Sequence, residues 1–445
     1  MTRRPYVELR LPLREEPLLL MTRLVRSGLF DPYVVYESSV GWSLAGGVLT
    51  SVRLSGEEAT DLTHVGARLA EAPVAGWRAY GWASFELGAA LAGENTEGTE
   101  TLLHLIVPTD EVRTDATGIL IRSTAPERLH IIADHVRSAG TAPTPEPAGR
   151  IVLPLEDTGN YRAAVAAALL EVRSQGPLEK VILSRQVPVP VAVDLVTSFV
   201  TGRRANTPAR SFLLDLGGIQ AAGFSPETVA EVTADGRVTT RPLAGTRARS
   251  GAPGDDARLR ADLLGDPKEI HEHAISVTLA LEDLGSVCDD TCVSEYMTVV
   301  DRGTVQHLAS TITGHLLPGC GPWDAFAALF PAVTATGIPK EPAYPLIRAL
   351  EGKPRGLYAG AVLTCDADGT LDAALVLRSI FRRDGRCWLQ SGAGIVRQSQ
   401  PEREHEETCE KLRGVAHHLV PAAIGGPEAR GDAPPGEAAP PDAGG

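Results

Sequence analysis

Residues 356–396 contain the feature that most limits the fold of this chain, because apolar segments follow one another there with only tight turns between them. The segment predicts three successive strands, with turns at "DADG" (366–369) and "RDG" (383–385). Strands joined by such short turns pair in antiparallel fashion. The chain is therefore expected to contain a large antiparallel sheet.

The rest of the chain alternates between helical and extended patterns without the regular repeat of β-α-β units. An apolar residue every three or four positions predicts a helix over 160–176. This mixture indicates an α+β (α/β) fold, with large antiparallel sheets and helices outside. Further helices are expected near 56–71, at 267–284 and at 401–418, and further strands from Lys180 and within 302–316.

Composition divides the chain into four parts. Residues 1–137 are expected to form an N-terminal part of the fold, and 138–149, rich in Pro, Gly and Ala, a linker or surface loop. Residues 150–424 carry the candidate site residues. Residues 425–445 lack the apolar content needed to pack and are expected to be disordered.

Charge and hydrophobicity exclude several classes of protein. The net charge of −14 argues against a nucleic-acid binder and against a basic membrane-binding patch. No apolar run is long enough for a transmembrane helix. Charged residues interrupt the apolar segment at the N-terminus, so a cytoplasmic protein is expected. The six cysteines form no C-x-x-C pair and are interpreted as reduced thiols.

The stretch "DPKEIHEHA" (266–274) predicts the start of a helix that carries two carboxylates on one face. Asp266 is the expected N-cap, and Glu269 completes a D-x-x-E capping box. Glu272 lies three residues further along the same face. The second carboxylate repels the first unless a positive charge lies between them.

A second helix, in "QPEREHEETCEKL" (400–412), repeats this spacing with Glu404 and Glu407. If the two helices face each other, four carboxylates surround one point, which is severely unfavourable without a cation. Ligation by oxygen alone indicates Mg²⁺; the alternative is two solvated helix faces. A zinc site from His271, His273 and His405 is disfavoured, because the first two diverge on a helix.

Lys180 and Glu227 are candidates for general base and general acid. Lys180 enters the strand "KVILS", where apolar neighbours would favour the neutral amine that a base needs. The alternative is an ammonium group that reaches water at the strand end. Glu227, in "GFSPET", is either a positioned acid or an ordinary loop carboxylate.

Two glycine-containing strand ends and one arginine are candidates for anion binding. In "PLAGTR" (242–247) and "SGAGIV" (391–396), free N–H groups could hold an anion, or the glycines could mark a bulge or tight turn. Arg378 lies within the apolar "DAALVLRSIF". A guanidinium there needs a partner, and a carboxylate matches its geometry.

Together, these motifs resemble the chorismate-utilising enzymes: anthranilate, aminodeoxychorismate, isochorismate and salicylate synthases. The resemblance covers roughly 178–415 in family order and is looser in the N-terminal third, where "GWRAYGWASFEL" carries it. It implies one large unit of two stacked antiparallel sheets, with helices outside and the active site between the sheets. The matching blocks are "KVILSR", "FSPE", "PLAGTR", "DPKEIHEHAISV", "GTVQHLAST", "FPAVTATGIPK", "PRGLYAGAV", "ALVLRS" and "GAGIVRQSQPEREHEETCEKL".

The resemblance also implies a site for chorismate, a substrate with two carboxylates. One carboxylate would bind through Mg²⁺, and an Arg/Tyr pair would hold the other. The implied residues are Glu269, Glu272, Glu404 and Glu407 for the metal; Arg378 and Tyr358 for the carboxylate; Gly392, Ala393, Gly394 and Lys411 for the cradle; Ala244, Gly245, Thr246 and Thr334 for the pocket; and Lys180, Glu227 and His307 for catalysis.

Four positions bear on the branch of the family. Anthranilate synthases usually have Gln where Lys180 stands, and aminodeoxychorismate synthases have Lys where Ala244 stands. Water is therefore the implied nucleophile, and no obligatory amidotransferase subunit is expected. Thr334 and Ala335 resemble the salicylate synthases, which implies a role in siderophore or other secondary metabolism. The alternatives are an isochorismate synthase that releases its intermediate and an inactive relative that serves as a binding subunit.

The implied chemistry has two steps. Lys180 would deprotonate water for attack on ring C2 while Glu227 protonates the departing C4 hydroxyl, and each contributes roughly 10²–10⁴-fold. The C2 hydrogen of isochorismate then passes to the enolpyruvyl methylene as pyruvate leaves. This second step is pericyclic and depends mainly on positioning.

Overall fold

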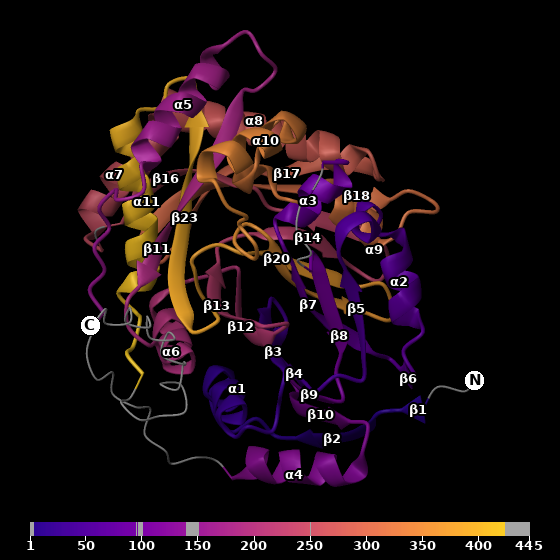
Figure 1. Cartoon of the computed structure of the whole chain (residues 1–445). Coiled ribbons are helices and arrows are strands. Elements are labelled where there is room, and N and C mark those ends of the chain that lie inside the picture. Colours follow the sequence, from indigo (N-terminus) through magenta and orange to yellow (C-terminus); the bar gives the residue numbers. More distant parts are fainter. Residues whose placement is uncertain (1–3, 95, 97–100, 139–150, 250, 423–445) are drawn as a thin grey trace, which may run out of the picture.

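Two large antiparallel sheets organise the molecule (Figure 1). The computed structural model describes residues 4–94, 96, 101–138, 151–249 and 251–422. The larger sheet has eleven strands, in the spatial order β19 (Gly337–Ile338), β11 (Lys180–Val189), β23 (Arg386–Val396), β22 (Ser379–Arg383), β13 (Ile219–Ser225), β12 (Arg210–Leu216), β3 (Tyr33–Ser38), β4 (Gly41–Gly46), β9 (Asp110–Asp115), β10 (Gly118–Ser123) and β2 (Val7–Leu11).

The second sheet has ten strands. Its long strand β17 (Cys288–Arg302) pairs with β18 beside the main path. The main path runs β16 (Leu243–Ala248), β18 (Val305–Leu316), β15 (Arg237–Thr240), β14 (Thr228–Val232), β21 (Leu371–Leu375), β20 (Ala361–Asp366), β7 (Arg78–Ala83), β8 (Leu103–Val107) and β5 (Thr50–Leu54). A separate pair joins β1 (Arg4–Pro5) to β6 (Val74–Ala75).

Helices lie outside these sheets, as Figure 1 shows for α5, α11 and α4. None of the helices within the described ranges is long and apolar enough to cross a membrane. Their bounds are α1 (Pro17–Arg26), η1 (Gly56–Thr60), α2 (Thr63–Ala70), α3 (Glu86–Leu91), α4 (Pro126–Arg137), α5 (Tyr161–Arg173), α6 (Leu195–Ala205), α7 (Pro253–Gly265), α8 (Pro267–Gly285), α9 (Pro322–Leu329), η2 (Val333–Ala335), α10 (Lys340–Glu351) and α11 (Pro401–Ala416).

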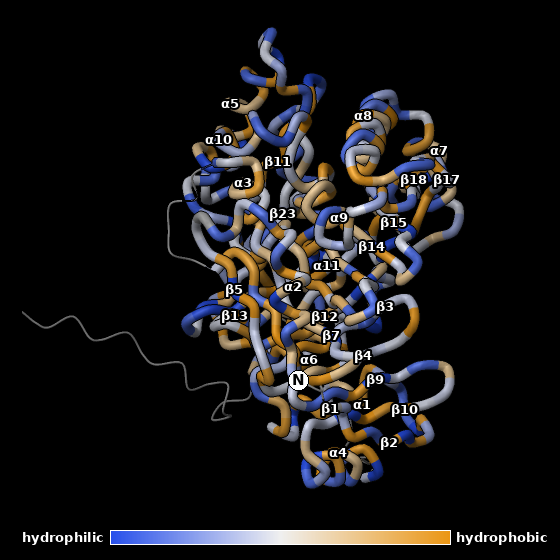
Figure 2. The backbone as a smooth tube through the Cα atoms, turned by 90° about the vertical axis from the view of Figure 1, so that its right-hand side faces the viewer, coloured by the Kyte–Doolittle hydropathy of each residue, from blue (hydrophilic) through white to orange (hydrophobic). Residues whose placement is uncertain are grey.

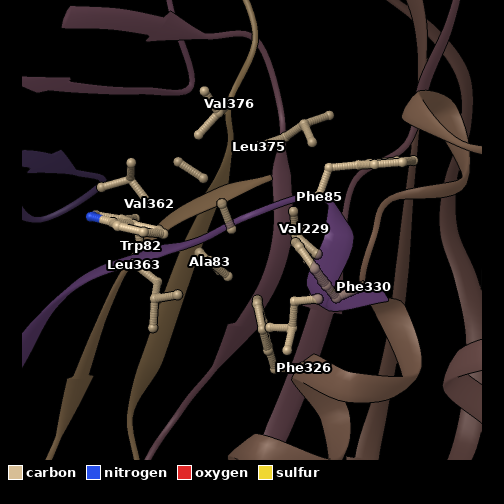
Figure 3. Close-up of a cluster of buried hydrophobic side chains, with 14 of the residues drawn as sticks. Trp82, Ala83, Phe85, Val229, Phe326, Phe330, Val362, Leu363, Leu375 and Val376 are labelled. Carbon is tan, nitrogen blue, oxygen red and sulfur yellow. The ribbon is translucent and has the colours of Figure 1, made fainter. Parts of the chain in front are cut away.

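The main hydrophobic core lies between the two sheets, which confirms the predicted α+β class with stacked antiparallel sheets. It joins Tyr36 and Phe212 of the larger sheet to Tyr80 of the second, and all three are almost fully buried. Figure 2 shows hydrophobic stretches gathered along the strands in the middle of the molecule. Figure 3 shows part of this core, with Trp82, Ala83, Phe85, Val229, Phe326, Phe330, Val362, Leu363, Leu375 and Val376.

Both sheets take strands from either side of the predicted boundary near residue 137. β3 pairs with β12, and β7 pairs with β20, so the N-terminal part and the later part share each sheet. The predicted linker falls almost entirely on residues 139–150, and the predicted disordered tail on 425–445; these stretches lie outside the described residues.

Two predictions of local structure are wrong. Residues 356–396 form four strands rather than three, because the chain breaks at Arg378. Arg378 has a φ of 50°, a left-handed conformation that a strand does not accommodate. The helix expected near 56–71 forms two pieces, η1 and α2, because Asp61 is extended and accepts a hydrogen bond from the Thr63 backbone.

Candidate functional site

One cavity collects most of the predicted site residues. Its wall includes Glu227, Ala244, Gly245, Thr246, Glu272, His307, Thr334, Tyr358, Arg378, Gly392, Ala393, Gly394, Glu407 and Lys411. The other predicted residues, Lys180, Glu269 and Glu404, are not part of the wall. Each is buried, and Lys180 forms an ion pair with the wall residue Glu272.

The start of α8 is set by its N-cap, as predicted. The Asp266 carboxylate accepts hydrogen bonds from the backbone of Lys268 at 2.8 Å and of Glu269 at 3.4 Å. Glu269 itself does not close the predicted capping box. Its carboxylate instead accepts from the Thr246 backbone at 3.1 Å and from the Arg247 guanidinium at 2.9 Å. Glu269 therefore ties the first turn of α8 to β16.

The glycine of "PLAGTR" marks a bulge, one of the two interpretations that the sequence leaves open. The register between β16 and β18 shifts between Ala244 and Thr246. Gly245 has a φ of 82°, and a Cβ there would lie 3.2 Å from a Glu269 oxygen. The bulge turns the Thr246 N–H toward that carboxylate and brings the strand end to the cavity wall.

The four glutamates are buried rather than solvated, so the interpretation as two exposed helix faces is wrong. A divalent cation is not required to balance their charge, because each glutamate pairs with a basic side chain of the chain itself. The pairs are Glu269 with Arg247 (2.9 Å), Glu272 with Lys180 (3.0 Å), Glu404 with Lys268 (3.1 Å) and Glu407 with Lys411 (2.7 Å).

The glutamates nevertheless influence one another strongly. Burial and the charge of Glu407 raise the pKa of Glu404 to about 7. Burial alone would raise the pKa of Glu407, but the ammonium groups of Lys411 and Lys268 hold it near 2. Burial and the charge of Glu407 also raise the pKa of Glu269. The carboxylates of α8 and α11 thus share one electrostatic environment.

One carboxylate oxygen of this cluster is free to bind a cation. The Glu404 Oε2 atom is buried and has no hydrogen-bond partner among the described residues. A Cβ at Gly394 would overlap the Glu272 oxygen that pairs with Lys180, so the glycine makes space for this ion pair beside β23. Within the described part of the chain, however, no three acidic, His or Cys side chains converge as closely as in a preformed metal centre.

The histidines considered for zinc do not converge on one point. His271 is exposed on α8. His273 is fully buried and contacts the Ser310 hydroxyl through Nε2 at 2.7 Å. His405 lies on α11 with its ring beside Tyr161. The zinc interpretation has no support in this geometry.

Lys180 is fully buried at the start of β11, so the alternative of an ammonium group in water is wrong. Its Nζ donates to the Ser276 hydroxyl at 3.0 Å and forms the ion pair with Glu272. The Cε lies 3.1 Å from where a Cβ of Gly394 would be, so the glycine makes space for this side chain. A role as base requires that the amine first release its proton.

Glu227 is a buried, held carboxyl rather than a loose loop residue. It is 3% exposed in the turn between β13 and β14. The Thr334 hydroxyl and the Leu243 backbone N–H (2.6 Å) donate to its two oxygens. Burial raises its pKa to about 7, although the hydrogen bonds from Thr334 and Leu243 and the charges of Lys180 and Arg378 oppose the shift. A substantial fraction therefore keeps its proton at neutral pH, as a general acid requires.

Arg378 presents a partly buried guanidinium at the cavity wall. Its left-handed backbone places the side chain between β21 and β22, where it donates to the Arg302 carbonyl at 3.0 Å and to His307 Nε2. The expected carboxylate partner is not found among the described residues. Burial and the charge of Arg302 lower its pKa to about 10. Such a group is suited to bind an anionic ligand.

His307 orients this guanidinium. Its Nδ1 lies 3.1 Å from the Thr246 hydroxyl and 3.3 Å from the Gly245 carbonyl, so the Nδ1–H donates and Nε2 accepts from Arg378. Burial and the charge of Arg378 hold the pKa of His307 well below its usual range. The ring is therefore neutral, and both of its nitrogens are engaged.

The remaining wall is formed by Tyr358 and by the glycine-containing end of β23. The last residue of β23 that pairs with β22 is Leu389, whereas pairing with β11 continues to Val396. The other edge of 391–396 thus has no strand partner among the described residues, and residues 391–394 of this stretch line the cavity. Lys411 donates to the Gly392 carbonyl at 3.0 Å.

Comparison with known proteins shows where this chain has relatives. A family model for chorismate binding enzymes matches residues 35–417. The chain is 40% identical over 441 residues to a salicylate synthase of Mycolicibacterium paratuberculosis, a match that covers 92% of this chain and 95% of that protein. It is 37% identical over 254 residues to anthranilate synthase component 1 of Methanothermobacter thermautotrophicus, covering 57% and 54%.

The solved structures agree in fold. The menaquinone-specific isochorismate synthase of Escherichia coli superposes with a TM-score of 0.72 and 20% identity, covering 94% of this chain and 95% of that one. Component I of anthranilate synthase from Streptococcus pneumoniae gives a TM-score of 0.68 and 24% identity, covering 94% and 93%. At these identities the likeness concerns the architecture alone.

Proposed function

The chain belongs to the family of chorismate-binding enzymes, and from this premise we propose that it is a salicylate synthase. It converts chorismate through bound isochorismate to salicylate and pyruvate. The observation that carries the proposal is a single cavity whose wall holds both Glu227 and Arg378. Glu227 is a buried carboxyl with a pKa near 7, and Arg378 is a partly buried guanidinium without a carboxylate partner among the described residues. The near full-length similarity to a salicylate synthase favours this branch.

Substrate binding uses the two ends of the cavity. Arg378, held by His307, donates to one carboxylate of chorismate, and the Tyr358 hydroxyl in the same wall assists. Residues 391–394 line the part of the cavity in which the ring would lie. The four ion pairs leave the glutamate cluster without an excess of positive charge, so the second carboxylate of chorismate needs an added cation to bind there.

Mg²⁺ fits this cluster by its donor chemistry. The four side chains supply only oxygen, the preference of a hard divalent cation, and the unpartnered Glu404 Oε2 is a vacant donor. Glu269, Glu272, Glu404 and Glu407 would hold the ion. When bound, it supplies the positive charge that lets a dianionic substrate approach the carboxylates.

The hydration step uses Lys180 and Glu227. The Lys180 amine takes a proton from the water that attacks C2, and Glu227 gives its proton to the departing C4 hydroxyl. Thr334 and the Leu243 N–H hold the acid in place for this transfer. Because water rather than ammonia is the nucleophile, we expect no obligatory amidotransferase subunit.

The second step depends on the position of the enolpyruvyl arm over the ring. Thr334 and Ala335 belong to η2 and line the cavity. The small Ala335 leaves room for the arm, and no further acid or base is needed for a pericyclic transfer. An isochorismate synthase that releases its intermediate is the second candidate, and the intact set of Lys180, Glu227 and four glutamates argues against an inactive binding subunit.

Chromatographic analysis of the products after incubation with chorismate and Mg²⁺ tests the proposal. We expect salicylate and pyruvate in equal amounts, with isochorismate only transient. Accumulation of isochorismate without salicylate above the uncatalysed rate would establish the second candidate instead. The use of the salicylate in siderophore or other secondary metabolism stays a prediction.

A further inference from the structure

Arg355 does not line the cavity, yet its guanidinium contacts two segments that do. It stands in "PRG", three residues before Tyr358, and is 3% exposed. Nη1 donates to the Ala335 carbonyl at 2.8 Å, and Nη2 donates to the Ile182 carbonyl at 2.7 Å. Ala335 and Ile182 both belong to the cavity wall, one in η2 and the other in β11.

Glu351 holds this guanidinium in one orientation. At the end of α10, its carboxylate accepts from Arg355 Nη2 at 2.6 Å and from Nε at 3.0 Å. The same carboxylate accepts from the Ser184 backbone at 2.6 Å, which adds a second link to β11. The two terminal nitrogens of a planar guanidinium lie at a fixed separation, and Glu351 fixes their orientation. The guanidinium is therefore well suited to hold two carbonyls at a set distance from each other.

The backbone of Arg355 is anchored on its other side. The N–H groups of Arg355 and Gly356 donate to Glu86 at 2.7 and 3.1 Å, and the guanidinium lies 4.3 Å from the centre of the Phe85 ring. The side chain therefore has little freedom. A displacement of either carbonyl would leave buried donors unpaired, which is unfavourable.

These contacts connect the two segments that carry Thr334, which holds Glu227, and Lys180. Ala335 follows Thr334, whose hydroxyl holds Glu227, and Ile182 lies two residues after Lys180 on the same strand face. We infer that Arg355 is a positioning residue that sets the separation between the acid-bearing and base-bearing walls. It also fixes the segment that confines the enolpyruvyl arm. The inference rests on the proposed function.

The substitution Arg355→Lys tests this inference. Lysine keeps the charge but has a single side-chain nitrogen, so it cannot donate from both positions that Nη1 and Nη2 of Arg355 occupy. The decisive quantity is the ratio of released isochorismate to salicylate from chorismate and Mg²⁺, because this ratio does not depend on how much enzyme is folded. We expect it to rise at least tenfold, with a lower kcat. Glu351→Gln, which keeps the shape but removes the charge, is expected to shift the ratio in the same direction by a smaller factor.

Arg210→Lys is the matched control. Arg210 is 5% exposed and pairs with Asp372 and Glu231, none of which lines the cavity. Its substitution should lower the melting temperature without a change in product ratio. An unchanged ratio in folded Arg355→Lys, or in Glu351→Gln if the lysine variant does not fold, overturns the inference. Absence of both products with the unmodified chain would instead contradict the proposed function.

Discussion

Replacement of Glu227 by Gln separates the chemistry of this residue from its packing. The amide keeps the size of the side chain. Its oxygen can accept from the Leu243 N–H, and its NH₂ group can donate to the Thr334 hydroxyl, so both observed contacts are retained. An amide cannot deliver a proton to a leaving hydroxyl. We therefore expect a loss of at least ~10²-fold in the hydration of chorismate.

The same substitution has an effect on stability that depends on pH. Burial raises the pKa of Glu227 from 4.5 to about 7, which corresponds to roughly 3 kcal/mol. The favourable contribution of the protonated carboxyl is fully present below pH 4.5 and is lost as the pH rises through 7. The amide does not titrate. Relative to the unmodified chain, Glu227→Gln should gain roughly 2–3 kcal/mol of unfolding free energy between pH 5 and pH 8.

Two measurements check this prediction. Steady-state conversion of chorismate gives the rate loss, and urea unfolding at pH 5 and pH 8 gives the stability difference. Retention of more than a third of the activity would place Glu227 outside the mechanism. A stability difference that does not change with pH would show that the carboxyl does not titrate in the predicted range, and the assignment as a neutral acid would lose its basis.

Three further variants test the other proposed roles. Lys180→Ala should abolish chorismate hydration but leave turnover of supplied isochorismate partly intact; equal losses in the folded variant would contradict a selective role as base. Glu404→Gln should weaken both Mg²⁺ binding, measured by calorimetry, and catalytic activity, and EDTA should abolish the activity of the unmodified chain. Glu406→Gln, on the exposed side of α11, is the control. Full activity of Glu404→Gln without added metal would refute the metal site. Thr334→Ala combined with Ala335→Leu should shift the product from salicylate to isochorismate. The ratio of the two products changes about tenfold for each 1.4 kcal/mol by which the substitutions alter the relative barriers to release and conversion of isochorismate. An unchanged product ratio would refute the role of η2.

Local patterns were sufficient to predict the elements that carry the site. The helix that begins after Asp266 and the strand from Lys180 follow from capping and from apolar periodicity, and the structure confirms both. The α+β class followed from the succession of strands and short turns. These features depend on residues close together in the chain, which is where sequence patterns are informative.

The partners of the charged groups could not be predicted, because they come from distant segments. Arg247 and Lys268 stand inside the quoted motifs, but their pairing with the glutamates depends on how β16, α8 and α11 meet. The break at Arg378 depends on a left-handed backbone that no local pattern indicates. No pattern in the sequence indicated a role for Arg355, apart from its position three residues before Tyr358.

The central claim, that one cavity hydrates chorismate at C2 and then releases pyruvate, is tested most directly by labelling the solvent oxygen. When the reaction is run in ¹⁸O-water with Mg²⁺, the attacking water becomes the phenolic hydroxyl of salicylate, so the product should be heavier by two mass units. Pyruvate should appear in equal molar amount. Unlabelled salicylate, or labelled isochorismate that accumulates without salicylate, would contradict the account.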